Sequence, residues 1–357
     1  MRTPRPLPDL PVGTGSLDAS LLTTDQLEAA GVSRHRRRTA LGEGRIVQLA
    51  GSLFTTAERS ADANAWELLR LRTAAFIRTA PPGAIAAGWS AMALHQLDSM
   101  TKPPPLPSVI RLRPGYSGSD RTAWGHTRYC LVPDHCVTRV ETTQVLTPGF
   151  AVCDLARANG LLSCLMIADM LATTAPGREQ IGTAAAAMRR WPREPRAAWI
   201  AQRCDGLAES PLETAGRYAA IRAGLPVPIS NAWVGPGYPR ARLDHWWPDQ
   251  ALAGEGDGAV KYKENPAAVM AAQLTRQHDL EQLGVRFVRY NWQLAVRQRL
   301  LLGDRFAAAL AAPGARPSRE LRWWTCEEGW AVVRDLSALE RFPGRPVTLA
   351  SFRGCVE

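Results

Sequence analysis

The runs LDHWW at residues 243–247 and GEGDGAVKY at residues 254–262 decide the fold of the C-terminal half of this chain. The PDQ segment between them is typical of a turn, so the two runs are expected to form neighbouring strands of a hairpin. In such a hairpin Asp244 and Glu255 converge at one end of a sheet. Two carboxylates at one place make a hard-oxygen site that suits Mg²⁺.

Lys261 follows in the second run and brings a positive charge near this pair of acids. Carboxylates, a divalent metal and a lysine are the groups needed to hydrolyse a phosphodiester. The acids also have a plainer interpretation, because acids at strand ends are often only solvated and EGDG is compatible with a simple turn. His245 is left out of the candidate site, since alternation along a strand places it on the face opposite Asp244.

The segments around the hairpin predict a mixed sheet flanked by helices. Ser210 is expected to cap a helix that has Pro211 in its first turn, and Gly224 is expected to end it. The complete expectation is an αβββαβ order, with a helix over residues 211–223, strands near 229–234, 241–247 and 250–255, a helix over 267–283, a strand over 285–290 and a helix over 292–311.

This order resembles the PD-(D/E)XK nuclease superfamily, and more narrowly the bacterial branch related to the very-short-patch-repair endonucleases. The resemblance covers about residues 205–310. It is carried by SPLE at residues 210–213, Asp244 on a strand, EGDG at 255–258 and LGVRFVR at 283–289. It implies a restriction-endonuclease-like fold and a hydrolase that cuts DNA with Mg²⁺ as its cofactor.

The same resemblance implies roles for individual residues. Asp244 matches the central metal-binding aspartate, Glu255 the second metal ligand, and Glu213 a supporting carboxylate. The superfamily often has lysine two places after the glutamate, where this chain has Asp257, which adds a third oxygen ligand. The related branch has histidine four places after that aspartate, where Lys261 stands and would orient water or stabilise the pentavalent charge. This departure leaves open which group transfers the proton.

Two arginines, Arg286 and Arg289, follow on the next predicted strand. An odd separation along a strand directs their side chains to opposite faces. One of them would contact phosphate while the other pairs with an acid. The alternative is that both are solvated at the sheet edge.

The first ordered part of the chain has the order of a winged helix-turn-helix. Thr23 or Thr24 caps a first helix that ends at Gly31, Ser33 opens a second, and a β ribbon follows over residues 45–55. In such a motif the second helix enters the major groove, where arginines contact phosphates or guanine edges. The candidate DNA-binding residues on or beside this helix are Arg34, Arg36, Arg37, Arg38 and Arg45.

This region is similar to the N-terminal winged-helix domain of the abortive-infection family of antitoxins. The match runs over about forty residues, from LTTDQL at 22–27 through GVSR at 31–34 to GSLF at 51–54. The resemblance implies a bacterial regulator that represses its own operon, with a cognate toxin as a further partner. The alternative is a basic solvated helix that packs on its own chain.

The composition favours a polyanionic partner. The formal net charge of the 357 residues is +10, and neutralised phosphates release counterions. No run approaches the ~20 apolar residues that span a bilayer, and no signal-peptide h-region is visible. The seven cysteines form no CxxC pair, which predicts free thiols in a reducing cytoplasm.

The expected class is therefore a multidomain α+β or α/β protein of the cytoplasm. Its expected divisions are a disordered tail (1–15), a winged helix-turn-helix (16–60), a mixed α/β middle region (61–204), a nuclease-like domain (205–312) and a C-terminal extension (313–357). The expected function is DNA binding with Mg²⁺-dependent hydrolysis of phosphodiester bonds. The alternative is a non-catalytic autoregulator or antitoxin in which the nuclease fold is a scaffold.

Overall fold

The computed structural model describes residues 7–13, 15–97, 99–258, 266–313 and 317–325, with only the backbone described over 266–272. It is a mixed α/β protein with three sheets in these residues. The chain forms two compact units. Unit 1 comprises residues 1–167 and 179–202, and unit 2 comprises 168–178 and 203–357. The main division falls two residues before the predicted boundary at 204.

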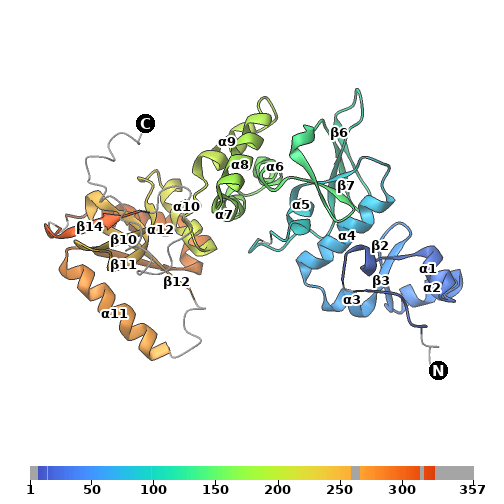
Figure 1. Ribbon diagram of the computed structural model, residues 1–357, viewed down its shortest axis with the longest axis horizontal. Helices are drawn as coiled ribbons and strands as arrows, with labels where there is room; N and C mark the ends of the chain where they lie inside the picture. The colour runs from blue at the N-terminus through green and yellow to red at the C-terminus, as the bar shows by residue number, and fades with distance from the viewer. Residues whose placement is uncertain (1–6, 14, 98, 259–265, 314–316, 326–357) are drawn as a thin grey trace. The chain divides into compact units, whose positions relative to one another are not determined.

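The N-terminal part of unit 1 has two short helices followed by a hairpin (Figure 1). Thr23 caps the first helix through a capping box with Gln26, and Ser33 caps the second. The strand order of the small sheet is β1-β3-β2. Its elements are β1 (Leu22–Thr23), α1 (Thr24–Ala29), α2 (Arg34–Gly42), β2 (Ile46–Ala50) and β3 (Leu53–Thr56).

A small apolar core holds these elements together. It is formed by the buried side chains of Leu22, Leu27, Val32, Ala40, Ile46 and Phe54. Leu7, Leu10 and Val12 pack against it, although the sequence places them in a disordered tail. Burial of their apolar side chains explains why this part of the predicted tail is attached to the fold.

The middle region of unit 1 contains a six-stranded sheet and several helices. The strand order is β6-β7-β5-β4-β9-β8. The strands are β4 (Ile85–Ala86), β5 (Ser108–Arg111), β6 (Gly118–Arg121), β7 (His126–Tyr129), β8 (Val137–Val140) and β9 (Thr143–Leu146). The helices are α3 (Ala57–Asp62), α4 (Ala65–Thr79), α5 (Gly88–Leu94), α6 (Pro148–Ala158) and α9 (Glu194–Arg203). α7 (Leu161–Ala172) and α8 (Ala175–Ala187) are each divided between units 1 and 2.

Unit 2 has the αβββαβ order that the sequence predicts. Ser210 accepts a hydrogen bond from the backbone of Glu213 and so caps the first helix. The elements are α10 (Pro211–Arg222), β10 (Ile229–Pro236), β11 (Ala241–Trp247), β12 (Leu252–Asp257), α11 (Pro266–Gln282), β13 (Arg286–Asn291) and α12 (Arg299–Ala311), with a π-helical turn over Gln293–Arg297.

The five-stranded sheet of unit 2 has the order β13-β12-β11-β10-β14. β12 and β13 are parallel, and the other neighbours are antiparallel. β14 (Leu321–Trp324) pairs with β10, which corrects the prediction that the domain ends at residue 312. Trp323 joins the apolar core of this sheet, so β14 is an edge strand and no separate extension.

Helices cover the unit 2 sheet on both faces (Figure 1). Leu280 of α11 packs into the core with Trp246 and Ala253. α10 and α12 pack closely together. A Cβ atom added at Gly303 of α12 would lie only 2.8 Å from the Cβ atom of Ala223, the C-cap residue of α10. The acids of β11 and β12 therefore lie in a sheet that is enclosed by helices.

Candidate metal centre and nucleic-acid interface

Asp244 and Glu255 lie side by side on β11 and β12. The antiparallel register pairs His245 with Gly254, and continuing it places Asp244 opposite Glu255. Directly opposed residues of antiparallel strands share a face, with Cβ atoms roughly 5 Å apart. Asp244 Oδ2 also accepts a hydrogen bond of 2.7 Å from the backbone N–H of Gly256. The register thus brings together the two acids that the hairpin predicts.

Glu213 approaches these strands from the first turn of α10. Its side chain is 8% exposed. Its Oε2 accepts hydrogen bonds from Asn231 Nδ2 at 2.7 Å and from the backbone of Glu209 at 2.8 Å, and Ser210 Oγ donates to Oε1. Burial raises the pKa of Glu213, and the negative charge of Asp244 raises it further. Glu213 is thus held by Ser210, Glu209 and Asn231 at the start of α10.

Two arginines form ion pairs with the acids of β12, Glu255 and Asp257. Arg276 Nη2 lies 3.8 Å from Glu255 Oε2, and Glu255 is almost completely buried. Arg289 binds both carboxylate oxygens of Asp257, with Nε donating to Oδ2 at 3.1 Å and Nη2 donating to Oδ1. Arg286 instead donates to the backbone carbonyls of Ala309 and Gln250. The strand arginine that pairs with an acid is therefore Arg289, and Arg286 acts as a structural donor.

A buried pair, His245 and Tyr290, lies behind the acids, and the sequence analysis misses it. The Tyr290 hydroxyl lies 2.8 Å from His245 Nε2, and both side chains are almost fully buried. Burial lowers the pKa of His245 to about 3. Burial also raises the pKa of Tyr290 well above its usual value, and the charges of Asp244 and Glu213 add to that effect. The Tyr290 hydroxyl and the His245 ring thus share one hydrogen bond, in which the tautomer of His245 sets the donor.

The carboxylate oxygens of Asp244 and Glu255 are of the kind that binds Mg²⁺. Within the described residues, no group of three or more His, Cys, Asp or Glu side chains is placed to hold a metal ion. The predicted set of Asp244, Glu255 and Asp257 is thus not assembled, because Asp257 is bound by Arg289. Mg²⁺ commonly uses only one or two carboxylates together with water and substrate phosphate. Asp244 and Glu255 supply such a pair, and Lys261 lies outside the described residues.

Helix α2 divides its arginines between the fold and the solvent. Arg36 Nη1 donates to the backbone carbonyl of Gly31 at 2.9 Å. Arg37 lies 3.5 Å from Glu28 and over the ring of Phe54. In the described part of the chain, no hydrogen bond or ion pair involves the exposed side chains of Arg34 and Arg38.

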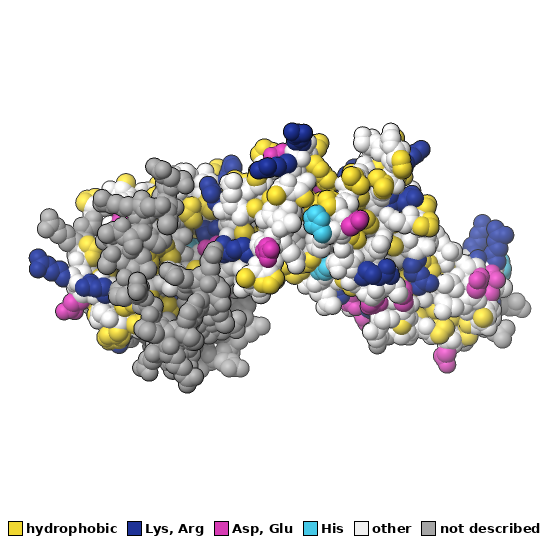
Figure 2. All heavy atoms as spheres, turned by 45° about the horizontal axis from the view of Figure 1, so that its top comes forward, with side chains coloured by type: hydrophobic (Ala, Val, Ile, Leu, Met, Phe, Trp, Pro, Cys, Tyr) yellow, Lys and Arg dark blue, Asp and Glu magenta, His cyan; other side chains and the backbone are white. Residues whose placement is uncertain are grey.

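Arg45, at the start of the hairpin, pairs with Glu43 through a hydrogen bond of 2.7 Å. Figure 2 shows a group of basic side chains at the end of unit 1 where α1 and α2 lie. Of the five predicted DNA-binding arginines, Arg34 and Arg38 thus have guanidinium groups free for an external anion. Arg36, Arg37 and Arg45 also stabilise the fold.

Comparison with models of protein families gives no match to this chain, and comparison with curated proteins gives none either. Among the described residues, no helix combines the length and the apolar character needed to cross a membrane. The functional interpretation therefore rests on the geometry of the acid centre and of α2. The acid centre is defined here as Glu213, Asp244, Glu255 and Asp257.

Proposed function

We propose that the protein binds DNA and hydrolyses its phosphodiester bonds with Mg²⁺ held by Asp244 and Glu255. The observation that carries this proposal is the register of β11 and β12, which places these two acids opposite each other in an αβββαβ fold. This order and the SPLE, EGDG and LGVRFVR segments resemble the PD-(D/E)XK nucleases. A bound Mg²⁺ would activate water and neutralise charge on the scissile phosphate.

The protein groups around the acid pair have distinct parts in this proposal. Asp244 is oriented by the backbone N–H of Gly256, and Glu255 is held within the sheet. Burial and the charge of Asp244 raise the pKa of Glu213, so it is the described carboxylate best suited to hold a proton during the reaction. Lys261 retains its predicted role of stabilising negative charge on the phosphate.

DNA binding is assigned to α2 and the hairpin that follows it. The exposed guanidinium groups of Arg34 and Arg38 lie on a capped helix in a helix-turn-helix order. The net charge of +10 favours the approach of a polyanion. Phosphate contacts of this kind depend strongly on salt, because they release counterions.

The test is cleavage of supercoiled plasmid DNA by the full chain. Wild-type protein should nick or linearise the plasmid with Mg²⁺ present and should be inhibited by EDTA. Asp244→Asn should lose at least about a hundredfold in rate, because a metal-binding oxygen and its charge are removed. Asp249→Asn changes an exposed acid of the neighbouring turn and should cut normally. Equal cleavage by wild type and Asp244→Asn would refute the assignment.

The ion pairs of the acid centre favour a second candidate function. Arg276 and Arg289 already balance the charges of Glu255 and Asp257, as in a fold that no longer requires a metal. In this case the protein is a non-catalytic autoregulator, or the antitoxin of a neighbouring toxin. It would retard its own upstream DNA in a gel-shift assay without any cleavage in Mg²⁺, and wild type and Asp244→Asn would bind equally.

A further inference from the structure

The six-stranded sheet of unit 1 has one covered face and one partly open face, which is called the open face. Ala86 pairs with Val109 on one side and with Val145 on the other, and all three side chains are fully buried. α4 and α5 pack on this side. Alternation directs Ile85, Ile110, Gln144 and Leu146 to the opposite face, where Ile110 and Leu146 are buried but Gln144 is exposed. The open face is where a ligand can reach the sheet.

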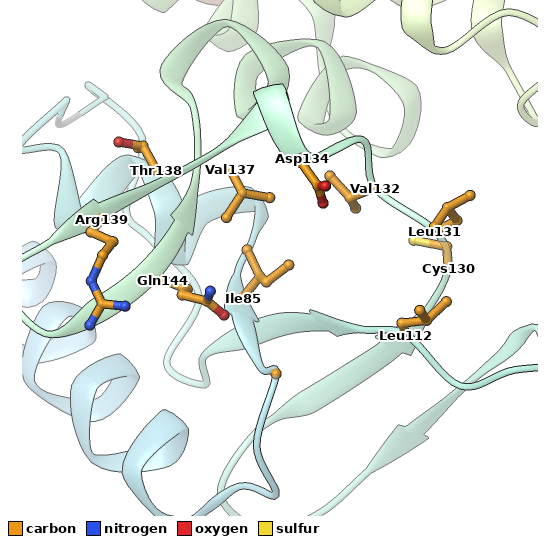
Figure 3. A pocket seen from close by; sticks show the side chains of 11 residues that line it. Ile85, Leu112, Cys130, Leu131, Val132, Asp134, Val137, Thr138, Arg139 and Gln144 are labelled. Atoms are coloured by element: carbon orange, nitrogen blue, oxygen red, sulfur yellow. The ribbon is translucent and has the colours of Figure 1, made fainter.

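A pocket of about 420 Å³ lies on this open face (Figure 3). Ile85, Val132 and Val137 form apolar parts of its wall, and the strongly exposed Leu112 and Leu131 lie at one end. The volume is within the range of roughly 300–1,000 Å³ that is usual for small-molecule sites, which are mostly apolar with a few polar groups.

The polar groups of this pocket are available to a ligand. Figure 3 shows Asp134 and Gln144 beside the apolar side chains, with Arg139 at the end away from Leu131. Within the described ranges, neither a hydrogen bond nor an ion pair engages the side chains of Asp134 and Gln144. Arg139 donates one N–H to the carbonyl of Thr142 at 2.7 Å, which leaves its other N–H groups for an anion.

A second, smaller pocket of about 170 Å³ in the same unit differs in this respect. Its acid, Asp154, is held by Arg128 at 2.6 Å and by Arg157 at 3.0 Å. The hydroxyl of Ser90 is bonded to Thr73 and to the backbone of Ser108. Its carboxylate and hydroxyl are thus engaged within the fold, whereas Asp134 and Gln144 of the larger pocket are not; the buried His126 Nε2 and Arg128 Nε of the smaller pocket have no hydrogen-bond partner in the described residues.

The geometry points to a site for a small zwitterion with an apolar body, such as an apolar amino acid or dipeptide. Asp134 would bind the ammonium group and Arg139 the carboxylate, while Ile85 and Val137 contact the apolar side chains. Asp134 and Arg139 are exposed, and a purely apolar ligand would make no use of either charge. A ligand of one charge would leave the opposite group unpaired. This inference is independent of the proposed nuclease activity.

Calorimetric titration of the full chain with the dipeptide Leu-Leu tests the proposal. The dipeptide should bind. Its N-acetylated form lacks the ammonium and its amide lacks the carboxylate, so each should bind at least about tenfold more weakly. Gly-Gly should give no measurable binding because it lacks apolar side chains. No heat from Leu-Leu at millimolar concentration, or equal binding of all four compounds, would overturn the proposal.

Two variants assign the contacts. Asp134→Asn should weaken Leu-Leu binding about tenfold and abolish the discrimination against the N-acetylated form, whereas Arg139→Gln should abolish the discrimination against the amide. Glu179→Gln and Arg189→Gln change exposed residues outside the pocket and should bind as wild type does. Thermal melting checks that each variant is folded. Unchanged discrimination in folded Asp134→Asn and Arg139→Gln would refute the assignment.

Discussion

The acid centre of unit 2 and helix α2 of unit 1 each concentrate charge of one sign. They differ in whether the protein supplies partners for this charge. In the acid centre, Glu213 and Glu255 are buried, Asp244 and Asp257 are half-buried, and the fold supplies Arg276, Arg289 and Asn231 as partners. On α2, Arg34 and Arg38 face solvent without such partners. Buried charge requires compensation from the protein, whereas exposed charge is compensated by water and is available to a ligand.

This difference has a consequence for mutation. Substitutions within the enclosed part of unit 2 should change the free energy of unfolding, because each buried polar group leaves its partner unsatisfied when it is removed. Substitutions on the exposed face of α2 should change DNA affinity and leave stability almost unchanged.

The largest effect is expected from the buried ion pair of Asp169 and Arg217. Each side chain is 2% exposed, their atoms are 2.6 Å apart, and Thr214 and the backbone of Asp205 also donate to Asp169. Asp169→Ala should lower the free energy of unfolding by about 3–5 kcal/mol, because it removes the nearest carboxylate from a buried guanidinium and leaves only that of Asp205, at 3.9 Å. Urea denaturation measures this loss.

The control for that variant is Arg240→Gln. Arg240 pairs with Asp279 at the surface, where both side chains are substantially exposed. Such pairs contribute little to stability, so the urea midpoint should hardly move. A comparable loss in both variants would contradict the contrast between buried and exposed charge.

The second effect concerns the close packing of α10 against the His245 and Tyr290 pair. A Cβ at Gly216 would lie 2.6 Å from His245 Nε2 and closer still to the Tyr290 hydroxyl. Gly216→Ala should therefore cost about 1–3 kcal/mol by overpacking. Gly182→Ala places a methyl group where nothing lies within 4 Å, so it should stabilise by about 0.5–1 kcal/mol. Stabilisation by Gly216→Ala would show that α10 is packed less tightly.

The third effect is a pH dependence in unit 1. Burial lowers the pKa of His95, whose Nε2 lies 2.8 Å from the carbonyl of Leu146. The unfolded chain therefore takes up this proton first, and the stability contributed by neutral His95 is lost as pH falls below about 6.5. His95→Gln should reduce the slope of the free energy of unfolding against pH. Exposed His135→Gln should keep the slope of the wild type. Denaturation between pH 5 and 8 measures the difference, and an unchanged slope in His95→Gln would exclude His95 as its source.

The smallest effect on stability is expected from the double variant Arg34→Gln with Arg38→Gln. Its free energy of unfolding should stay within about 0.5 kcal/mol of wild type, because neither side chain has a partner in the described residues. If both arginines contact phosphates, DNA affinity should fall and the slope of log affinity against log salt should decrease by about two. Fluorescence anisotropy with a labelled duplex measures both quantities. Unaltered affinity would remove α2 from the proposed interface.

The sequence could predict much of the candidate acid centre because the signals are local. Ser210, Pro211 and Gly224 fix the bounds of α10 through neighbouring residues. Apolar runs separated by the PDQ turn fix β11 and β12, and their antiparallel pairing then brings Asp244 opposite Glu255. Alternation along β11 places His245 on the face opposite Asp244, but it could not predict the contact of His245 with Tyr290.

The sequence could not predict the partners of these acids. Arg289 reaches Asp257 only because β12 and β13 are parallel in a particular register, and the pair is separated by 32 positions. β14 adds to the sheet after a segment with no clear period. Arg36 and Arg37 looked equivalent to Arg34 in a basic run, but their positions on α2 direct them to Gly31, Glu28 and Phe54.

The amino-acid sequence by itself determined the order of helices and strands, their caps and the residues that carry charge, since these depend on neighbours a few positions apart. The tertiary structure alone decided which charges are buried, which are paired and where the sheet of unit 1 leaves a pocket. The physical reason is that burial and pairing depend on register and packing between distant segments, whose free energy is a sum of many small contacts that no short run contains.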